Sequence, residues 1–176
     1  MGKRSDFERK ERDFYPTPRK AVEPLIPHIA ESGKKWLEPC AGAGDLIDHI
    51  QILTDKTCME AYDIEPQRDD IMELDFFDLE VGSHIDLVIT NPPWDRKILH
   101  PMLEHARTFP CPTWFLFDAD WAHTNQAKPY LEYCDMIVAV GRVKWIEDSK
   151  HTGKDNCCWY RFQPHKITDT KFIGKK

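Results

Sequence analysis

The residues whose types and spacing indicate a reaction most specifically are Asn91, Pro92, Pro93 and Trp94, which follow an apolar run that ends at Thr90. Two prolines cannot continue a sheet, so the chain must turn there and present its backbone carbonyls at fixed positions. The Asn91 side-chain oxygen and the Pro92 carbonyl can then accept both hydrogens of a planar amino group. With those hydrogens held, the nitrogen can become tetrahedral and direct its lone pair at an electrophilic methyl group. A strand-ending turn alone would explain the prolines, but neither the Asn nor the Trp.

A second motif, Glu38 to Leu46, joins an apolar strand to a helix through Gly42 and Gly44. Glycines there let the backbone approach a ligand closely, and the free N–H groups at the start of the next helix face it. Such a pair is weak evidence alone, because any tight strand-to-helix turn can contain it.

Acidic residues recur where the next two strands end, at Asp63-Ile64 and at Asp75-Phe76. Asp63 is placed to accept from the hydroxyls of a ribose. Asp75 can accept from an adenine amine while Phe76 packs on the ring. If only one of these acidic residues were present, solvent exposure at the end of a strand would be the simpler explanation for it. Their recurrence after the glycine motif indicates a nucleotide site.

Apolar strands alternate with helical stretches, which is typical of a parallel α/β sheet. A short helix is expected within 21–32. The expected strands are Lys35 to Glu38, Cys58 to Ile64, Met72 to Phe76, Ile85 to Thr90, Thr113 to Asp118, Met136 to Val140 and Cys157 to Phe162, and further helices are expected at Asp45 to Leu53, Ile98 to Arg107 and Gln126 to Tyr133. Arg142 to Ile146 is expected to complete a terminal hairpin with the last strand.

The composition predicts one soluble, intracellular domain, because 41% of the 176 residues are hydrophobic but no apolar run nears the roughly 20 residues of a membrane span. A cytoplasmic location is expected, in a bacterial host if the protein is phage-encoded. No zinc-ligand spacing occurs, so no metal is expected. Reduced thiols are expected at Cys40, Cys58, Cys111, Cys134, Cys157 and Cys158, which fall mostly in strand-like stretches.

The net charge of −6 argues against a protein that coats nucleic acid by bulk electrostatics. The charge is uneven, however, because residues 1–20 carry seven basic groups against four acidic ones. An arm at 1–12 is therefore either a solvated chain end or a basic segment that reaches a polyanion. The catalytic domain is expected at 13–165, with a tail at 166–176.

Together these motifs resemble the S-adenosylmethionine-dependent N6-adenine DNA methyltransferases, in the subgroup whose cofactor motifs precede the catalytic one. The resemblance covers most of the chain. Phe14 to Pro18 looks like the family's N-terminal cofactor motif, Glu38 to Leu46 like its glycine loop and Asn91 to Trp94 like its catalytic tetrapeptide. It implies a Rossmann-like class I methyltransferase fold, with a mostly parallel seven-stranded sheet, a terminal antiparallel hairpin and helices on both faces. The compact size is similar to small phage-type enzymes.

The resemblance also implies roles for single residues. Tyr15 and Thr17 would touch the methionine end of S-adenosylmethionine, and Glu38 would face its amino group directly or through water. A flipped adenine would stack on Trp94, which offsets about 1–3 kcal/mol of lost base stacking. The implied cofactor-binding residues are Tyr15, Thr17, Glu38, Pro39, Cys40, Ala41, Gly42, Gly44, Asp45, Leu46, Asp63, Ile64, Asp75, Phe76 and Asn91, and the implied catalytic residues are Asn91, Pro92, Pro93 and Trp94.

The sequence indicates the type of reaction more specifically than it indicates the substrate. No separate target-recognition domain fits after Phe162, so specificity is expected from loops 95–97, 121–128 and 144–156, or from a second subunit, or it is low. The same motifs occur in RNA adenine and protein glutamine-amide methyltransferases, and a catalytically silent cofactor-binding subunit is a further alternative. DNA is the expected partner and no membrane contact is expected, while RNA and a homodimer stay open.

Overall fold

The computed structural model describes residues 15–145, 153 and 155–175. The expected arm at 1–12 and most of the loop at 147–156 lie outside the described residues. Along the described chain the elements are α1 (Arg19–Val22), η2 (Glu23–Leu25), α2 (Ile26–Ile29), β1 (Lys35–Glu38), α3 (Asp45–Leu53), β2 (Thr57–Asp63), β3 (Met72–Glu73), η3 (Phe76–Asp78), β4 (Leu87–Thr90), α4 (Arg96–Ala106), β5 (Thr113–Asp118), η4 (Ala119–His123), η5 (Asn125–Ala127), α5 (Lys128–Leu131), β6 (Cys134–Arg142), β7 (Asn156–Phe162) and β8 (Lys171–Ile173).

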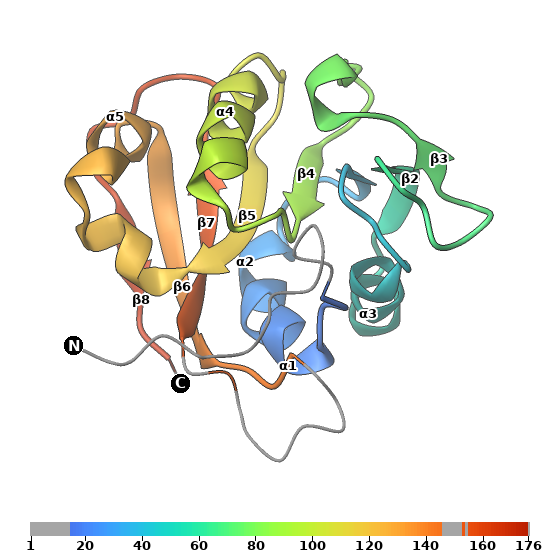
Figure 1. Ribbon diagram of the computed structural model, residues 1–176, viewed down its shortest axis with the longest axis horizontal. Helices are drawn as coiled ribbons and strands as arrows, with labels where there is room; N and C mark the ends of the chain where they lie inside the picture. Colours follow the sequence, from blue (N-terminus) through green and yellow to red (C-terminus); the bar gives the residue numbers. More distant parts are fainter. Residues whose placement is uncertain (1–14, 146–152, 154, 176) are drawn as a thin grey trace.

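The strands of the described chain form one mixed sheet in the order β3-β2-β1-β4-β5-β7-β6-β8 (Figure 1). Neighbours from β3 to β5 are parallel, and β7 runs antiparallel between β5 and β6. The expected mostly parallel sheet with an antiparallel last pairing is confirmed. The expected number of seven strands is wrong, because β8 pairs in parallel with β6 as an eighth strand.

The eighth strand lies within 166–176, where only a tail was expected. Polar contacts fasten this segment to the edge of β6 and to the residues before it. The Thr170 hydroxyl donates to the carbonyl of Cys134 at 2.7 Å, and Lys166 forms an ion pair with Glu132. These contacts hold the three residues of β8 alongside β6. Three residues are too few to show a strand pattern in the sequence.

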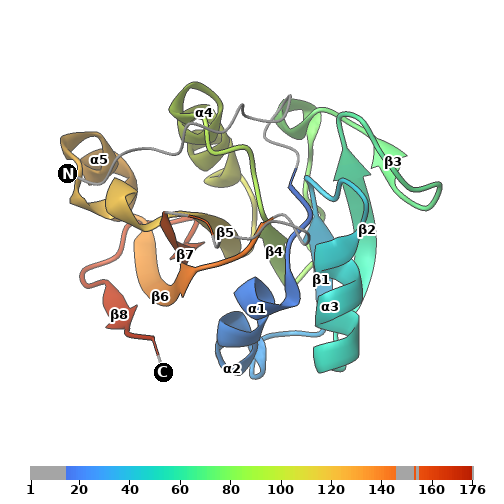
Figure 2. The ribbon, with the colours of Figure 1, turned by 60° about the horizontal axis from the view of Figure 1, so that its bottom comes forward.

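Helices cover both faces of the sheet, as expected (Figure 2). The central strands are therefore buried on both sides, and successive side chains enter different hydrophobic clusters. In β4, Leu87 and Ile89 pack with residues of α1, α2 and α3, while Val88 packs with residues of α4. Trp94 lies beyond the end of β4 and contacts both clusters.

Local sequence explains where the two longest helices begin. Gly44, with φ of 87°, precedes α3, and the observed range Asp45–Leu53 confirms the expected one. Asp95 accepts a hydrogen bond from the Lys97 backbone N–H, so α4 begins at Arg96, two residues before the expected start. No helix in the described part of the chain is long and apolar enough to cross a membrane.

Prolines divide the two shorter helical stretches. The expected helix within 21–32 is three short pieces, because Pro24 and Pro27 each lack a backbone N–H and favour the first turn of a new piece. Pro129 does the same in the expected helix at 126–133, which splits into η5 and α5.

The expected hairpin partner of the last strand is wrong. β7 pairs with β6 over Cys134 to Arg142, so Arg142 is the one residue of the expected partner 142–146 that takes part among the described residues, which end at 145 in this segment. Gly141 has a φ of 86° and the register shifts beside it, so the strand continues through a bulge that a glycine permits.

Candidate active site

A cavity of about 550 Å³ lies at the carboxyl ends of β1, β2 and β4. Of the residues expected at the site, those that line it are Tyr15, Thr17, Pro39, Cys40, Ala41, Gly42, Asp45, Leu46, Asp63, Ile64, Asp75, Phe76, Asn91 and Pro93. The other four, Glu38, Gly44, Pro92 and Trp94, are chain neighbours of lining residues. The motifs that were found far apart in the sequence therefore meet around one cavity.

The cavity is also lined by residues to which the motifs do not point. Ile98 and Met102 come from α4, and Gln67 and Phe77 follow the two acidic strand ends. Ile98 and Met102 are one helical turn apart in α4, which begins two residues after Trp94, and that spacing is the signal that would have identified them.

The glycine loop between β1 and α3 is held in place by Asp63. One carboxylate oxygen of Asp63 accepts from the Gly42 N–H at 2.8 Å, and the other accepts from the Glu65 N–H at 2.8 Å. Gly42 has a φ of 53°, which glycine adopts without strain. A carboxylate has about four acceptor positions, so Asp63 can still accept from hydroxyls of a ligand in the cavity.

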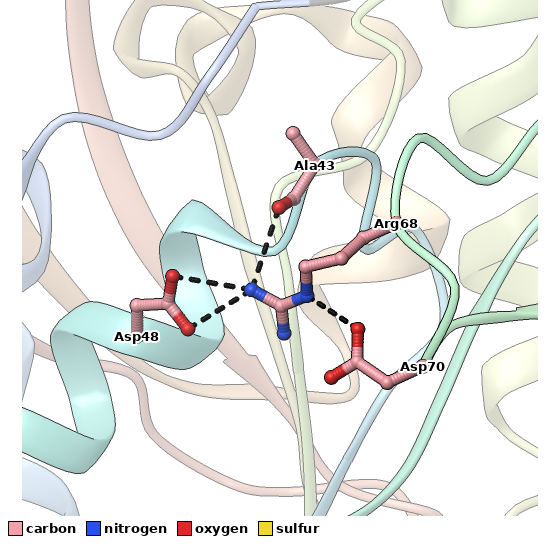
Figure 3. A network of polar contacts seen from close by, with 4 residues as sticks. All are labelled: Ala43, Asp48, Arg68 and Asp70. Atoms are coloured by element: carbon pink, nitrogen blue, oxygen red, sulfur yellow. Dashed lines mark hydrogen bonds and ion pairs between the residues drawn. The ribbon is translucent and has the colours of Figure 1, made fainter.

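Arg68 fastens the same loop from outside the cavity (Figure 3). Its guanidinium donates to both carboxylate oxygens of Asp48 on α3, at 3.0 and 3.1 Å, and to the Ala43 carbonyl at 3.5 Å. It also donates to Asp70 at 2.5 Å. The positive φ of Gly44 favours glycine, and a Cβ there would lie 2.2 Å from this guanidinium, so the end of the Arg68 side chain would have to move.

Glu38 at the end of β1 is an incompletely paired carboxyl. It is fully buried, and one of its oxygens accepts from the Cys40 N–H at 3.0 Å. Among the described residues, no hydrogen bond of ordinary geometry reaches its second oxygen or the buried hydroxyl of Thr90, although that hydroxyl is close enough to oppose part of the rise in the pKa of Glu38. Burial raises the pKa of Glu38 to about 8, and the charge of Asp63 acts in the same direction. Such a carboxyl would gain strongly from a cationic partner.

Cys40 is not suited to act as a nucleophile, although it lines the cavity. Burial raises the pKa of its thiol well above the ordinary value, and the carboxyl of Glu38 adds to the effect. A thiol that stays protonated is unreactive.

The aromatic residues after β3 divide between the core and the cavity. Phe76 is 6% exposed and makes ring contacts with His105, Phe109 and Phe115, so most of its ring belongs to the core. Phe77 is 44% exposed and presents more aromatic surface to a ligand. Asp75 accepts from the Phe77 N–H at 3.0 Å, which begins the short helix η3.

The Asn91 amide is held at both ends. Its nitrogen donates to the Thr17 hydroxyl at 3.1 Å, and its oxygen accepts from the Trp94 indole N–H at 3.3 Å. The same indole N–H donates to the Leu116 carbonyl in β5 at 3.1 Å. The Trp94 ring meets Trp145 edge-to-face, with centroids 5.3 Å apart. Trp94 therefore contacts the amide itself, in addition to the face it can offer a base.

No protein-family model matches the sequence, and a search of curated proteins finds no match. Solved structures are similar in fold. A protein described as an RNA methyltransferase from Pyrococcus horikoshii aligns with a TM-score of 0.62 and 18% identity, over 94% of each chain. A dimethyladenosine transferase from Plasmodium falciparum aligns with a TM-score of 0.56 and 14% identity, over 86% of this chain and 63% of the other.

A modification subunit described for a type I restriction enzyme of Vibrio vulnificus has a TM-score of 0.58 and 11% identity, over 92% of this chain and 47% of the other. The chain therefore has a methyltransferase fold, which confirms the expected fold class apart from the number of strands. In this chain, the cavity lies where the motifs converge.

Proposed function

We propose that this protein is an S-adenosylmethionine-dependent methyltransferase that methylates the N6 amine of adenine in DNA. The base would be flipped toward the turn Asn91 to Trp94, which we call the catalytic turn. The observation that carries the proposal is the orientation of Asn91. Asn91 lines the cavity, and its side-chain oxygen accepts from the indole N–H of Trp94, so that oxygen is fixed as an acceptor. An oriented acceptor next to a nucleotide-sized cavity is what transfer to a planar amine requires.

The residues around the cavity fit S-adenosylmethionine. Asp63 keeps acceptor capacity for the ribose hydroxyls, and Ile64, 54% exposed, offers apolar surface for the adenine. The incompletely paired carboxyl of Glu38 suits the ammonium of the methionine end. When bound, this cofactor supplies a methyl group on a positively charged sulfur.

The catalytic turn prepares the amine for attack. The Asn91 oxygen and the Pro92 carbonyl accept the two hydrogens of N6, which frees the nitrogen lone pair from the ring. The bound cofactor would supply its methyl group to this lone pair, so that the new nitrogen–carbon bond replaces the sulfur–carbon bond and a neutral thioether is left. One N6 proton leaves to water, because an amide oxygen and a backbone carbonyl are too weakly basic to keep it. Positioning and electrostatics, and not general-base catalysis, would lower the barrier.

Loops beside the catalytic turn would hold the nucleic acid. Arg96 donates to Gln126 at 3.0 Å, which joins two of the expected recognition loops, 95–97 and 121–128. Trp145 belongs to the third loop and packs against Trp94. These contacts support a substrate that is bound across the carboxyl ends of β4, β5 and β6.

The test is methyl transfer from labelled S-adenosylmethionine to unmethylated DNA, RNA or protein. We expect label in DNA as N6-methyladenine, and severe loss of transfer in Asn91→Ala with cofactor binding retained. Label in protein alone would refute the DNA proposal. Normal turnover by Asn91→Ala would mean that the catalytic turn is elsewhere, and binding without transfer to any acceptor would favour a silent subunit.

RNA is the second candidate substrate. It is favoured by the similar structures described as an RNA methyltransferase and a dimethyladenosine transferase. Label that appears as N6-methyladenine in RNA, and not in DNA, would select it. The reaction at Asn91 would be the same.

A further inference from the structure

We infer that Thr17 and Trp94 are positioning residues that fix which way the Asn91 amide faces, so that its oxygen is presented to the target amine. This inference rests on the proposed function. It differs from the roles that the resemblance implies, in which Thr17 touches the methionine end of the cofactor and Trp94 only stacks on the base.

The chemistry of the two partners determines the orientation of the amide. An indole N–H can only donate, so the Asn91 atom that faces Trp94 must be the oxygen. The Thr17 hydroxyl can donate or accept, and it accepts from the amide nitrogen on the other side. If the amide were flipped, two donors would face each other at Trp94. Trp94 therefore selects the orientation, and Thr17 secures it.

Both partners are themselves held. Thr17 is 6% exposed and comes from the segment before α1, 74 residues away from Asn91. The Trp94 indole N–H is shared with the carbonyl of Leu116, and the ring packs edge-to-face with Trp145. A hydrogen bond between restrained groups costs little further entropy, so both can restrict the amide effectively.

The orientation matters because a flipped amide would present N–H donors to the hydrogens of the target amine. Only molecules with the oxygen toward the substrate would then be competent. The oxygen has two lone pairs, so accepting from Trp94 leaves one for the amine. Loss of either support should therefore lower kcat by about tenfold, which corresponds to one hydrogen bond of about 1.4 kcal/mol, and should leave the cofactor Kd unchanged.

Three substitutions test the inference. Thr17→Val keeps the shape but loses the acceptor, Thr17→Ser keeps the acceptor, and Trp94→Phe keeps an aromatic face but loses the N–H. We expect Thr17→Val and Trp94→Phe to lower kcat at saturating substrate by about tenfold, and Thr17→Ser to restore most of it. The cofactor Kd, measured by calorimetry, should stay within about twofold of wild type.

The chain offers matched controls for both changes. Thr113 and Trp36 are fully buried, and among the described residues the Thr113 hydroxyl and the Trp36 indole N–H have no hydrogen-bond partner. Thr113→Val and Trp36→Phe therefore repeat the same chemical change away from Asn91, and kcat should not change. An equal loss of kcat in these controls would overturn the inference, because the effect would then be general destabilisation.

Two outcomes would overturn the inference while leaving the proposed function intact. One is a weaker cofactor Kd with unchanged kcat in Thr17→Val, which would make Thr17 a cofactor contact. The other is full kcat in both Thr17→Val and Trp94→Phe while Asn91→Ala is inactive. Full activity of Asn91→Ala would instead refute the proposed function. As a last check, adding Thr17→Val to Asn91→Ala should cause no further loss of activity.

Discussion

Replacing Glu38 by Gln should stabilise the cofactor-free protein at neutral pH and, at the same time, weaken cofactor binding. Glu38 is fully buried at the end of β1, with one oxygen unpaired among the described residues. A glutamine keeps the acceptor for the Cys40 N–H and resembles the protonated carboxyl. The substitution therefore removes the ionisable proton and changes the shape of the site very little.

The size of the effect follows from the pKa of Glu38, which burial raises from 4.5 to about 8. Between these values the folded protein keeps the proton and the unfolded chain loses it, so the free energy of unfolding falls as the pH rises. One pKa unit corresponds to about 1.36 kcal/mol, so the contribution lost between pH 4.5 and pH 7 is about 3 kcal/mol. The Glu38→Gln variant keeps this contribution at pH 7, because glutamine has no proton to lose. In a domain of this size, the resulting difference in the free energy of unfolding raises the Tm of the variant by about 6–12 °C above wild type.

The assay is thermal unfolding of the cofactor-free wild type and variant at pH 5 and at pH 7. The variant should be clearly more stable at pH 7, and the difference should fall to about a quarter of that size at pH 5, half a pH unit above the ordinary pKa of 4.5. Glu73→Gln is a matched control, because Glu73 is an exposed glutamate at the end of β3. That control should leave the Tm unchanged.

Calorimetry then tests the second half of the prediction. If Glu38 must ionise to pair with the ammonium of the cofactor, wild type should release nearly one proton on binding at pH 7, and its affinity should rise by up to about tenfold per pH unit from pH 6 to 7.5. The variant should show neither effect. Equal stability of wild type and variant at pH 7, with no proton release, would refute the reasoning.

The remaining predictions concern the glycine loop. Asp63→Ala should weaken cofactor affinity by about 1–3 kcal/mol by calorimetric titration, whereas Asp63→Asn should lose less because it keeps one acceptor; equal affinity of all three proteins would remove Asp63 from the site. Arg68→Ala should weaken cofactor binding by a few-fold without changing kcat at saturating cofactor, since partly exposed ion pairs contribute up to about 1 kcal/mol; a fall in kcat alone would contradict a role in loop positioning. Gly44→Ala should destabilise the protein by about 1–2 kcal/mol in urea unfolding, and combining it with Arg68→Ala should recover part of the loss; strictly additive effects would mean that the guanidinium does not restrict this position.

The sequence predicts most of the fold where local pattern and burial agree. β1, β5 and α3 have the expected bounds, because apolar residues in the two strands and a glycine before the helix leave few alternatives. β8 was not predicted, since its stability comes from pairing with β6 and not from its own three residues. β6 was expected to end before Gly141, because a glycine inside an apolar run is a common break, yet here it allows a bulge.

The sequence predicts those site residues that have suitable side-chain chemistry and also stand directly after a strand. Polar residues after parallel strands of one sheet must meet at the same edge, so Asp63, Asp75 and Asn91 were expected near one another, and all three line the cavity. The hydrogen bond from Asn91 to Thr17 spans 74 residues and depends on how the segment before α1 packs. No local pattern encodes such a contact.

The contact of Trp94 with both hydrophobic clusters has a consequence for heat tolerance. The helices on the two sides of the sheet pack on different clusters, and Trp94 is the one side chain among the described residues that packs against both, so loosening of either layer would reach it. The Asn91 side chain would then no longer be held in one orientation, although the sheet is still folded. On warming, turnover should therefore decline some degrees before the molecule as a whole melts.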